Sequence, residues 1–80
     1  MLVQLVTLEG ARLSVARVRH PKTQVACLAF SNPEGRVVAV VPRELVASVR
    51  DRLWQVSTKD GFTHTLGPVD VALLRRFARA

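Results

Sequence analysis

The sequence predicts an α+β fold with element order β-β-β-β-α-β-β-α, in which an antiparallel sheet carries two amphipathic helices on one face. Runs rich in β-branched residues are separated by acid–glycine pairs, and glycine supplies the positive φ that tight hairpin turns need. Two prolines are each followed two residues later by an acid, a pattern typical of helix starts. After each proline, apolar residues recur at three- and four-residue spacing, as on one side of a helix.

The first half of the chain reads as four strands. They are expected in the runs 2–8, 11–20, 23–30 and 36–41. The first two flank Glu9-Gly10, which predicts a hairpin. Pro21 ends the second strand because proline has no amide hydrogen to donate and restricts the residue before it. Residues 37–41 are continuously apolar, which is typical of a strand covered on both faces.

The second half predicts helix, hairpin and helix. Residues 42–54 form the first expected helix, beginning at Pro42 with Glu44 in its first turn. Its expected buried residues are Leu45, Val46, Val49 and Leu53. A hairpin around Asp60-Gly61 follows, and Gly67-Pro68 begins the second helix. There Asp70 takes the place of Glu44, and the expected buried stripe is Val69, Leu73 and Phe77.

Residues 31–54 align with residues 57–80 without a gap. The identical pairs are Ser31/Ser57, Gly35/Gly61, Pro42/Pro68 and Arg50/Arg76, and an acid is kept at Glu34/Asp60 and Glu44/Asp70. Either a ββα-type unit has been duplicated, or generic turn and helix-start chemistry has been used twice. We therefore expect one domain, 1–80, made of N-terminal strands (1–30), a first strand-turn-strand-helix unit (31–54) and a second (55–80).

Composition points to self-association. A chain of 80 residues buries only about 60 to 65% of the surface that it exposes when unfolded. Because 49% of the residues are hydrophobic, some apolar surface is expected between subunits, with a homodimer the simplest closed arrangement. The single Cys27 excludes an intramolecular disulfide and favours a cytoplasmic location. The N-terminus reads as a strand without the basic flank of a signal peptide, and no run reaches the roughly 18 apolar residues of a membrane span.

The charges divide unevenly. Twelve Lys and Arg stand against six Asp and Glu, for a net charge of +6, and ten of the twelve bases are arginine. The acids all have a local role beside turn glycines, in helix starts, or between two arginines, as Asp51 does. The bases have no such assignment, which predicts phosphate contacts, because a guanidinium can donate two parallel hydrogen bonds.

Six bases are the candidate nucleic-acid contacts: Arg17, Arg19, Lys22, Arg75, Arg76 and Arg79. Arg17 and Arg19 share one side of a strand, and Arg75 and Arg79 share one side of a helix. The alternative interpretations are a strand end kept soluble by charge and cations placed at a helix C-terminus. Arg43, Arg50 and Arg52 are interpreted as the solvated side of the first helix.

The aromatic residues bear on the kind of nucleic acid. Trp54, Phe30 and Phe77 are expected in the core, and Phe62, just after a turn glycine, is the candidate for a ring that stacks on a base. Few aromatic residues and many arginines favour duplex or structured nucleic acid over single strands.

Catalytic and metal chemistry are not expected. Cys27 lies among small apolar residues without a base beside it. His20 and His64 are far apart in the sequence, with no cysteine or acid at metal-ligand spacing. His64 shares its strand face with Phe62 and Leu66 and is expected to be a satisfied, partly buried imidazole. No catalytic residue, metal or cofactor is therefore predicted.

The sequence thus predicts a small, cytoplasmic, non-enzymatic nucleic-acid-binding protein, with DNA as the expected partner, a regulatory role and a homodimeric state. The alternative is a protein-binding modulator, an inhibitor or adaptor of a larger complex. It would dock through the apolar strand 2–8 or through the basic surface.

Overall fold

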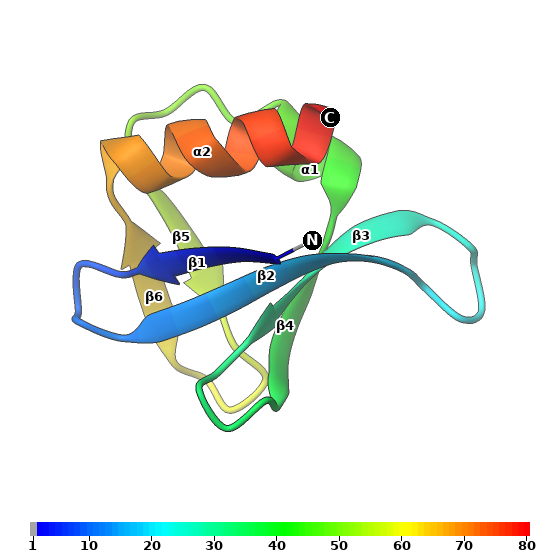
Figure 1. Cartoon of the computed structure of the whole chain (residues 1–80), viewed down its shortest axis with the longest axis horizontal. Coiled ribbons are helices and arrows are strands. Elements are labelled where there is room, and N and C mark those ends of the chain that lie inside the picture. The colour runs from blue at the N-terminus through cyan, green and yellow to red at the C-terminus, as the bar shows by residue number, and fades with distance from the viewer. Residues whose placement is uncertain (1) are drawn as a thin grey trace.

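The computed structural model describes residues 2–80, in eight elements. In chain order they are β1 (Leu2–Val6), β2 (Arg12–Arg19), β3 (Ala26–Ser31), β4 (Val37–Pro42), α1 (Arg43–Ala47), β5 (Trp54–Ser57), β6 (Thr63–Leu66) and α2 (Pro68–Arg79). The α+β class and the order of the elements are as the sequence predicts. Figure 1 shows α2 lying across one end of the strands, with α1 beside its C-terminal half.

The strands form two sheets rather than one. β1 to β4 make a four-stranded antiparallel meander, and β5 and β6 make a separate antiparallel hairpin. The expectation of a single sheet is therefore wrong. β5 does not pair with β4; residues of both strands line a hollow of about 430 Å³.

Single backbone contacts join the two sheets on both sides. The Lys59 amide donates to the Val38 carbonyl at 3.0 Å, and the Leu8 amide donates to the Thr65 carbonyl at 2.8 Å. Beside the second contact, the Thr65 amide donates to Glu9 Oε1 at 2.7 Å. This bond favours the ionised carboxylate and lowers the pKa of Glu9 below its ordinary value. The strands thus form a partly closed, barrel-like layer around the core.

Alternation along the strands decides which side chains face that core. In the register Leu5 lies opposite Leu13, and Val15 lies opposite Phe30. These four side chains are almost completely buried. Val56 and Leu66 complete the core from the hairpin, and Leu74 and Phe77 from α2; all of these side chains are buried. The Phe30 ring lies 6.4 Å from the Trp54 ring, centroid to centroid, so the predicted core aromatics meet across the two sheets.

The first helix is much shorter than the sequence predicts. α1 ends at Ala47, whereas the apolar spacing predicts a helix to residue 54. The Ser48 hydroxyl donates to the Leu45 carbonyl at 2.9 Å, a local bond that competes with further helical hydrogen bonds. Only Val46 of α1 is buried, and the expected core residues Leu45 and Leu53 are about half exposed. A five-residue element gives too little surface to count as an amphipathic helix.

The second helix forms where it is predicted, but with a different buried stripe. Pro68 takes the first turn and Asp70 lies two residues later. The buried residues are Val71, Leu74, Phe77 and Ala78, a spacing that also fits the helical period. Val69 is 80% exposed, so its predicted place in the core is wrong, and Leu73 is half-buried. Phe77 is buried as predicted, and Val71, Leu74 and Ala78 complete the stripe in place of Val69.

One turn geometry occurs three times, at Thr7–Ala11, Asn32–Arg36 and Thr58–Phe62. In each, the first amide donates to the carbonyl four residues on, and the glycine amide donates back to the first carbonyl. The first side chain accepts from the amide four residues on, at 2.9 to 3.1 Å. The glycines Gly10, Gly35 and Gly61 have φ of +87°, +83° and +85°, which side-chain-bearing residues rarely adopt.

This turn accounts for the glycine match between residues 31–54 and 57–80. The same turn also occurs near the N-terminus, outside the aligned region, and the two helices that follow the aligned turns differ in length, five against 12 residues. The internal repeat is therefore not confirmed as a structural unit.

Candidate functional site

Arg17 lies where β2 meets the end of α2. It pairs in register with the buried Leu28 and so points to the side of the sheet that α2 covers. Its guanidinium carbon lies 4.6 Å from the centroid of the Phe77 ring, and its Nη2 donates to the Phe77 carbonyl at 3.0 Å. The cation thus contacts both an aromatic ring and the last turn of a helix, two favourable partners for positive charge.

Arg43 caps the same helix end from α1. Its Nε donates to the Ala78 carbonyl, and its Nη2 donates to the Ala80 carbonyl at 2.7 Å. Carbonyls in the last turn of a helix have no partner within the helix, and the helix dipole places partial negative charge there. Arg43 is half-buried, so its expected place on a solvated helix side is wrong. Arg50 and Arg52 are exposed in the loop after α1.

Two arginines of α2 donate hydrogen bonds to the C-terminal end of α1 and to the loop after it. Arg75 Nη1 donates to the Val49 carbonyl at 2.8 Å, and Arg79 Nη2 donates to the Ala47 carbonyl at 3.1 Å. Arg17, Arg43, Arg75 and Arg79 together are called the arginine clamp. The expectation that the bases have no structural role is therefore wrong for the clamp. The acceptors of Arg17, Arg75 and Arg79 are backbone carbonyls inside the chain, which carry no formal charge, so these bonds leave the positive charge of the three guanidinium groups uncancelled.

Three arginines also line one small hollow. Arg17, Arg19 and Arg43 surround a space of about 240 Å³, together with Val18, Ala26 and Cys27. Arg19 Nη1 donates to the Gln24 carbonyl at 2.9 Å, which fixes its side chain against the β2–β3 loop. This arginine hollow brings together two of the six predicted contacts, Arg17 and Arg19, with Arg43, which is predicted on the solvated side of the first helix. No local signal marks Arg43, because its role depends on where α2 ends in space.

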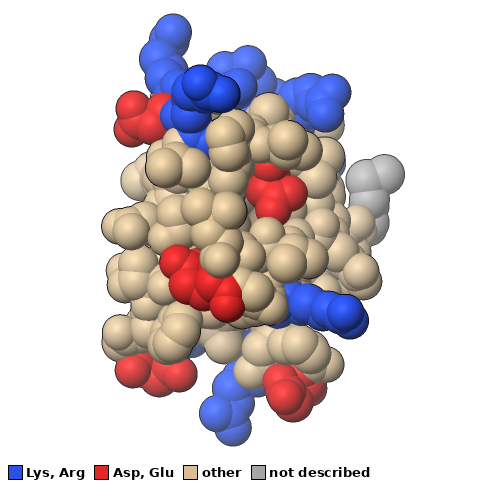
Figure 2. All heavy atoms as spheres, turned by 90° about the vertical axis from the view of Figure 1, so that its left-hand side faces the viewer, with Lys and Arg blue, Asp and Glu red and all other residues tan. Residues whose placement is uncertain are grey.

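The remaining predicted bases lie on either side of this region. Arg76 is exposed on α2, next to the clamp residue Arg75. Lys22 is exposed in the β2–β3 loop, the loop that holds Arg19. On the side of the molecule drawn in Figure 2, most basic groups lie at the end that carries the helices, and others lie lower, among the acidic groups.

Phe62 is 52% exposed, as the sequence predicts, but it lies apart from the arginines. It ends the Thr58–Phe62 turn, at the opposite end of the molecule from α2 (Figure 1). Its ring lies 4.8 Å from that of His64, centroid to centroid. The candidate stacking ring and the arginine hollow therefore do not form one surface.

His64 departs from the expectation of a satisfied imidazole. It pairs with Val56 in register and is only 9% exposed, and within residues 2–80 its Nδ1 has no hydrogen-bond partner. In the same turn, Asp60 accepts a hydrogen bond from the Thr58 hydroxyl, which lowers the pKa of the Asp60 carboxyl.

Neither a metal site nor a membrane span is found in the part of the chain that the structure describes. No three His, Cys, Asp or Glu residues there are grouped so that they could hold an ion. Neither described helix is long and apolar enough to cross a bilayer. Cys27 is buried, as its sequence neighbours predict.

A scan against protein-family models found no match, and neither the curated proteins nor the solved structures gave a significant match to this chain.

Proposed function

We propose that this chain is a small, non-enzymatic, nucleic-acid-binding protein that contacts phosphates through the arginine hollow and the exposed arginines of α2. The observation that supports this most is the convergence of Arg17, Arg19 and Arg43 on one hollow of about 240 Å³. Three guanidinium groups that line the same hollow attract an anion strongly. Arg76 and Arg79 extend the positive surface along α2.

Hydrogen bonds to backbone carbonyls hold the arginine side chains of the hollow in position before a phosphate binds. A guanidinium has five N–H donors, and each arginine of the hollow uses one or two of them on the protein's own carbonyls. The bonds hold the side chains in place and leave donors free. Less side-chain entropy is then lost when a phosphate binds.

Duplex or structured nucleic acid is the favoured partner. Binders of single strands usually combine basic residues with aromatic rings on which bases stack. Here the exposed Phe62 lies away from the arginines, and the Phe77 ring is covered by Arg17. Backbone phosphates are therefore the groups that this surface is built to contact, with DNA the expected duplex.

The salt dependence of binding tests this proposal. If Arg17, Arg19, Arg43, Arg76 and Arg79 neutralise about five phosphates, log affinity for a DNA duplex should fall with log salt at a slope of about −4.5. Affinity should then drop about 500-fold between 50 and 200 mM salt. Fluorescence anisotropy of labelled DNA and RNA duplexes measures both slopes. No binding to either duplex at low salt, or a flat dependence on salt, would contradict the proposal.

A matched pair of variants assigns the effect to this surface. Arg76 is exposed on α2, and Arg36 is exposed in the Asn32–Arg36 turn, so neither substitution disturbs the core. Arg76→Gln should weaken binding and reduce the magnitude of the slope by about 0.9, whereas Arg36→Gln should leave both unchanged. Equal effects of the two substitutions would show that net charge, and not this surface, determines binding.

A protein-binding role is the second candidate, favoured by one feature of the sheet. β1 is the terminal strand of the meander, so an extended segment of a partner could pair with it. In a pull-down treated with nuclease, a protein partner that stays bound would favour this role over nucleic-acid binding.

A further inference from the structure

A hollow of about 540 Å³ lies where the four-stranded sheet meets the β2–β3 loop. Its floor is a row of side chains from three strands. In the register Val18 lies opposite Cys27, and Cys27 lies opposite Pro42, so the three side chains point to the same side of the sheet. Cys27 is only 5% exposed, because its neighbours surround it. We call this space the apolar hollow.

The walls of the apolar hollow come from two loops. The β2–β3 loop contributes Pro21, Thr23 and Val25. The His20 amide donates to the Val25 carbonyl at 2.9 Å, which closes this loop at its base. On the other side, Lys59 of the hairpin turn lines the hollow, and its amide is bonded to the Val38 carbonyl at 3.0 Å. Backbone hydrogen bonds therefore fix both walls.

The lining combines apolar side chains with positive charge. Val18 and Val40 are 37% and 42% exposed here. Among the lining residues within 2–80, Arg19 and Lys59 are charged, and there is no Asp or Glu. Arg19 uses one N–H on the Gln24 carbonyl, which leaves further donors free. An anion therefore meets attraction and no repulsion from the side chains that line this hollow.

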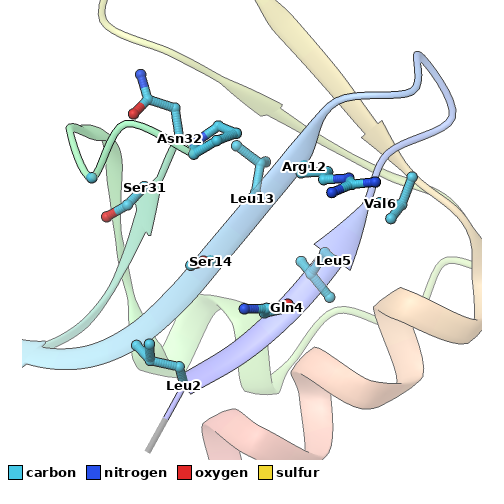
Figure 3. Close-up of a pocket in the computed structure, with 11 residues that line it drawn as sticks. Leu2, Gln4, Leu5, Val6, Arg12, Leu13, Ser14, Ser31 and Asn32 are labelled. Carbon is cyan, nitrogen blue, oxygen red and sulfur yellow. The ribbon is translucent and has the colours of Figure 1, made fainter.

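A larger hollow beside β1 has a different character. Figure 3 shows this space of about 800 Å³. Its lining includes the neutral polar side chains of Gln4, Ser14, Ser31 and Asn32, and among its lining residues within 2–80 the one charged side chain is Arg12. Apolar walls next to two cations are therefore a property of the smaller hollow.

We propose that the apolar hollow binds a small amphiphilic carboxylate, a molecule with a medium-length apolar chain and one anionic end. The volume of about 540 Å³ lies within the range of small-molecule sites, which are mostly apolar with a few polar groups that fix orientation. The chain would cover Val18, Val25 and Val40 and remove their apolar surface from water. The carboxylate would accept hydrogen bonds from Arg19 or Lys59.

An NMR titration with octanoate, without nucleic acid, tests the proposal. The methyl signals of Val18, Val25 and Val40 should shift and saturate, with a Kd of about 2 mM for so small a ligand. Octylammonium has the same chain with a positive end, and acetate has the negative end without the chain. Neither should give saturable shifts at these valines, because each lacks one of the two features that the hollow recognises.

Two pairs of variants assign the binding to the apolar hollow. Lys59→Gln should raise the Kd about threefold, whereas Lys22→Gln removes the same charge from a residue that does not line the hollow and should leave the Kd unchanged. Val40→Asp should raise the Kd at least about tenfold, because it places a carboxylate beside the ligand. Val69→Asp makes the same change on α2, at a valine that is 80% exposed, and should have no effect.

The proposal fails if octanoate gives no saturable shift at these valines up to about 20 mM, roughly tenfold above the expected Kd. Binding of octylammonium as tight as that of octanoate would show that the cations play no part. Equal effects of Lys59→Gln and Lys22→Gln would assign the attraction to net charge. Lys59 and Val40 lie outside the arginine hollow, and no nucleic acid is present, so these results do not depend on the proposed function.

Discussion

Replacing Phe30 with alanine is expected to lower the free energy of unfolding by about 4 kcal/mol, the largest effect that we predict for a single side chain. Phe30 is completely buried in β3 and contacts Trp54 of the hairpin across the core. Removing its ring leaves a cavity between the two sheets, which are otherwise joined by few backbone contacts. An 80-residue domain has a total stability of about 4 to 12 kcal/mol, so this variant should lose between about a third and all of its stability.

Urea denaturation followed by Trp54 fluorescence and circular dichroism measures this effect. Phe62→Ala is the matched control, because Phe62 is 52% exposed at a turn, and its loss should cost less than about 1 kcal/mol. Similar midpoints for the two variants would show that Phe30 is not the centre of the core.

Replacing Arg43 with methionine is expected to cost about 2 kcal/mol of stability. The variant keeps an unbranched apolar side chain but loses the donors to the Ala78 and Ala80 carbonyls at the end of α2. Hydrogen bonds from charged donors contribute about 1.5 to 3 kcal/mol, and the freed carbonyls here regain part of that from water. Arg52→Met, at an exposed loop position, should change stability by less than about 0.5 kcal/mol.

A double-mutant cycle with Arg79→Met extends this test. Arg43 and Arg79 donate in opposite directions between the same two helices. Once one of them is lost, the helix ends are less well held, and the second loss should cost at least about 0.5 kcal/mol less than it does alone. Strict additivity, or equal costs for Arg43→Met and Arg52→Met, would show that the clamp does not hold the helices together.

The local features of the fold could be predicted because their chemistry is local. Gly35 and Gly61 occupy positive φ, and Pro68 begins α2, as their residue types require. The division into two sheets could not be predicted, since it depends on which strands meet in space. One backbone hydrogen bond, from the Lys59 amide to the Val38 carbonyl, joins the hairpin turn to β4. The apolar spacing predicts too long a first helix because it continues to Leu53, which is 52% exposed and has no core to pack against.

The candidate site was predicted in part for the same reason. Arg17 and Arg19 share a side of β2, as alternation requires, and Arg79 reaches the end of α1 while Arg75 reaches the loop after it. Arg43 joins them only because α2 ends beside α1, an arrangement that no sequence spacing encodes. Phe62 is exposed as predicted, yet the fold separates it from the arginine hollow. The sequence identifies an exposed ring and a group of bases, but it does not show whether they lie close together in space.

The most direct test of phosphate binding at the arginine hollow is an NMR titration. The isotope-labelled protein is titrated with a DNA duplex, and the Nε–Hε signals of its arginines are followed. We expect the signals of Arg17, Arg19 and Arg76 to shift together, while those of Arg12 at the start of β2 and Arg36 in its turn stay in place. Equal shifts at all arginines, or shifts confined to Arg12 and Arg36, would show that the arginine hollow does not bind the duplex.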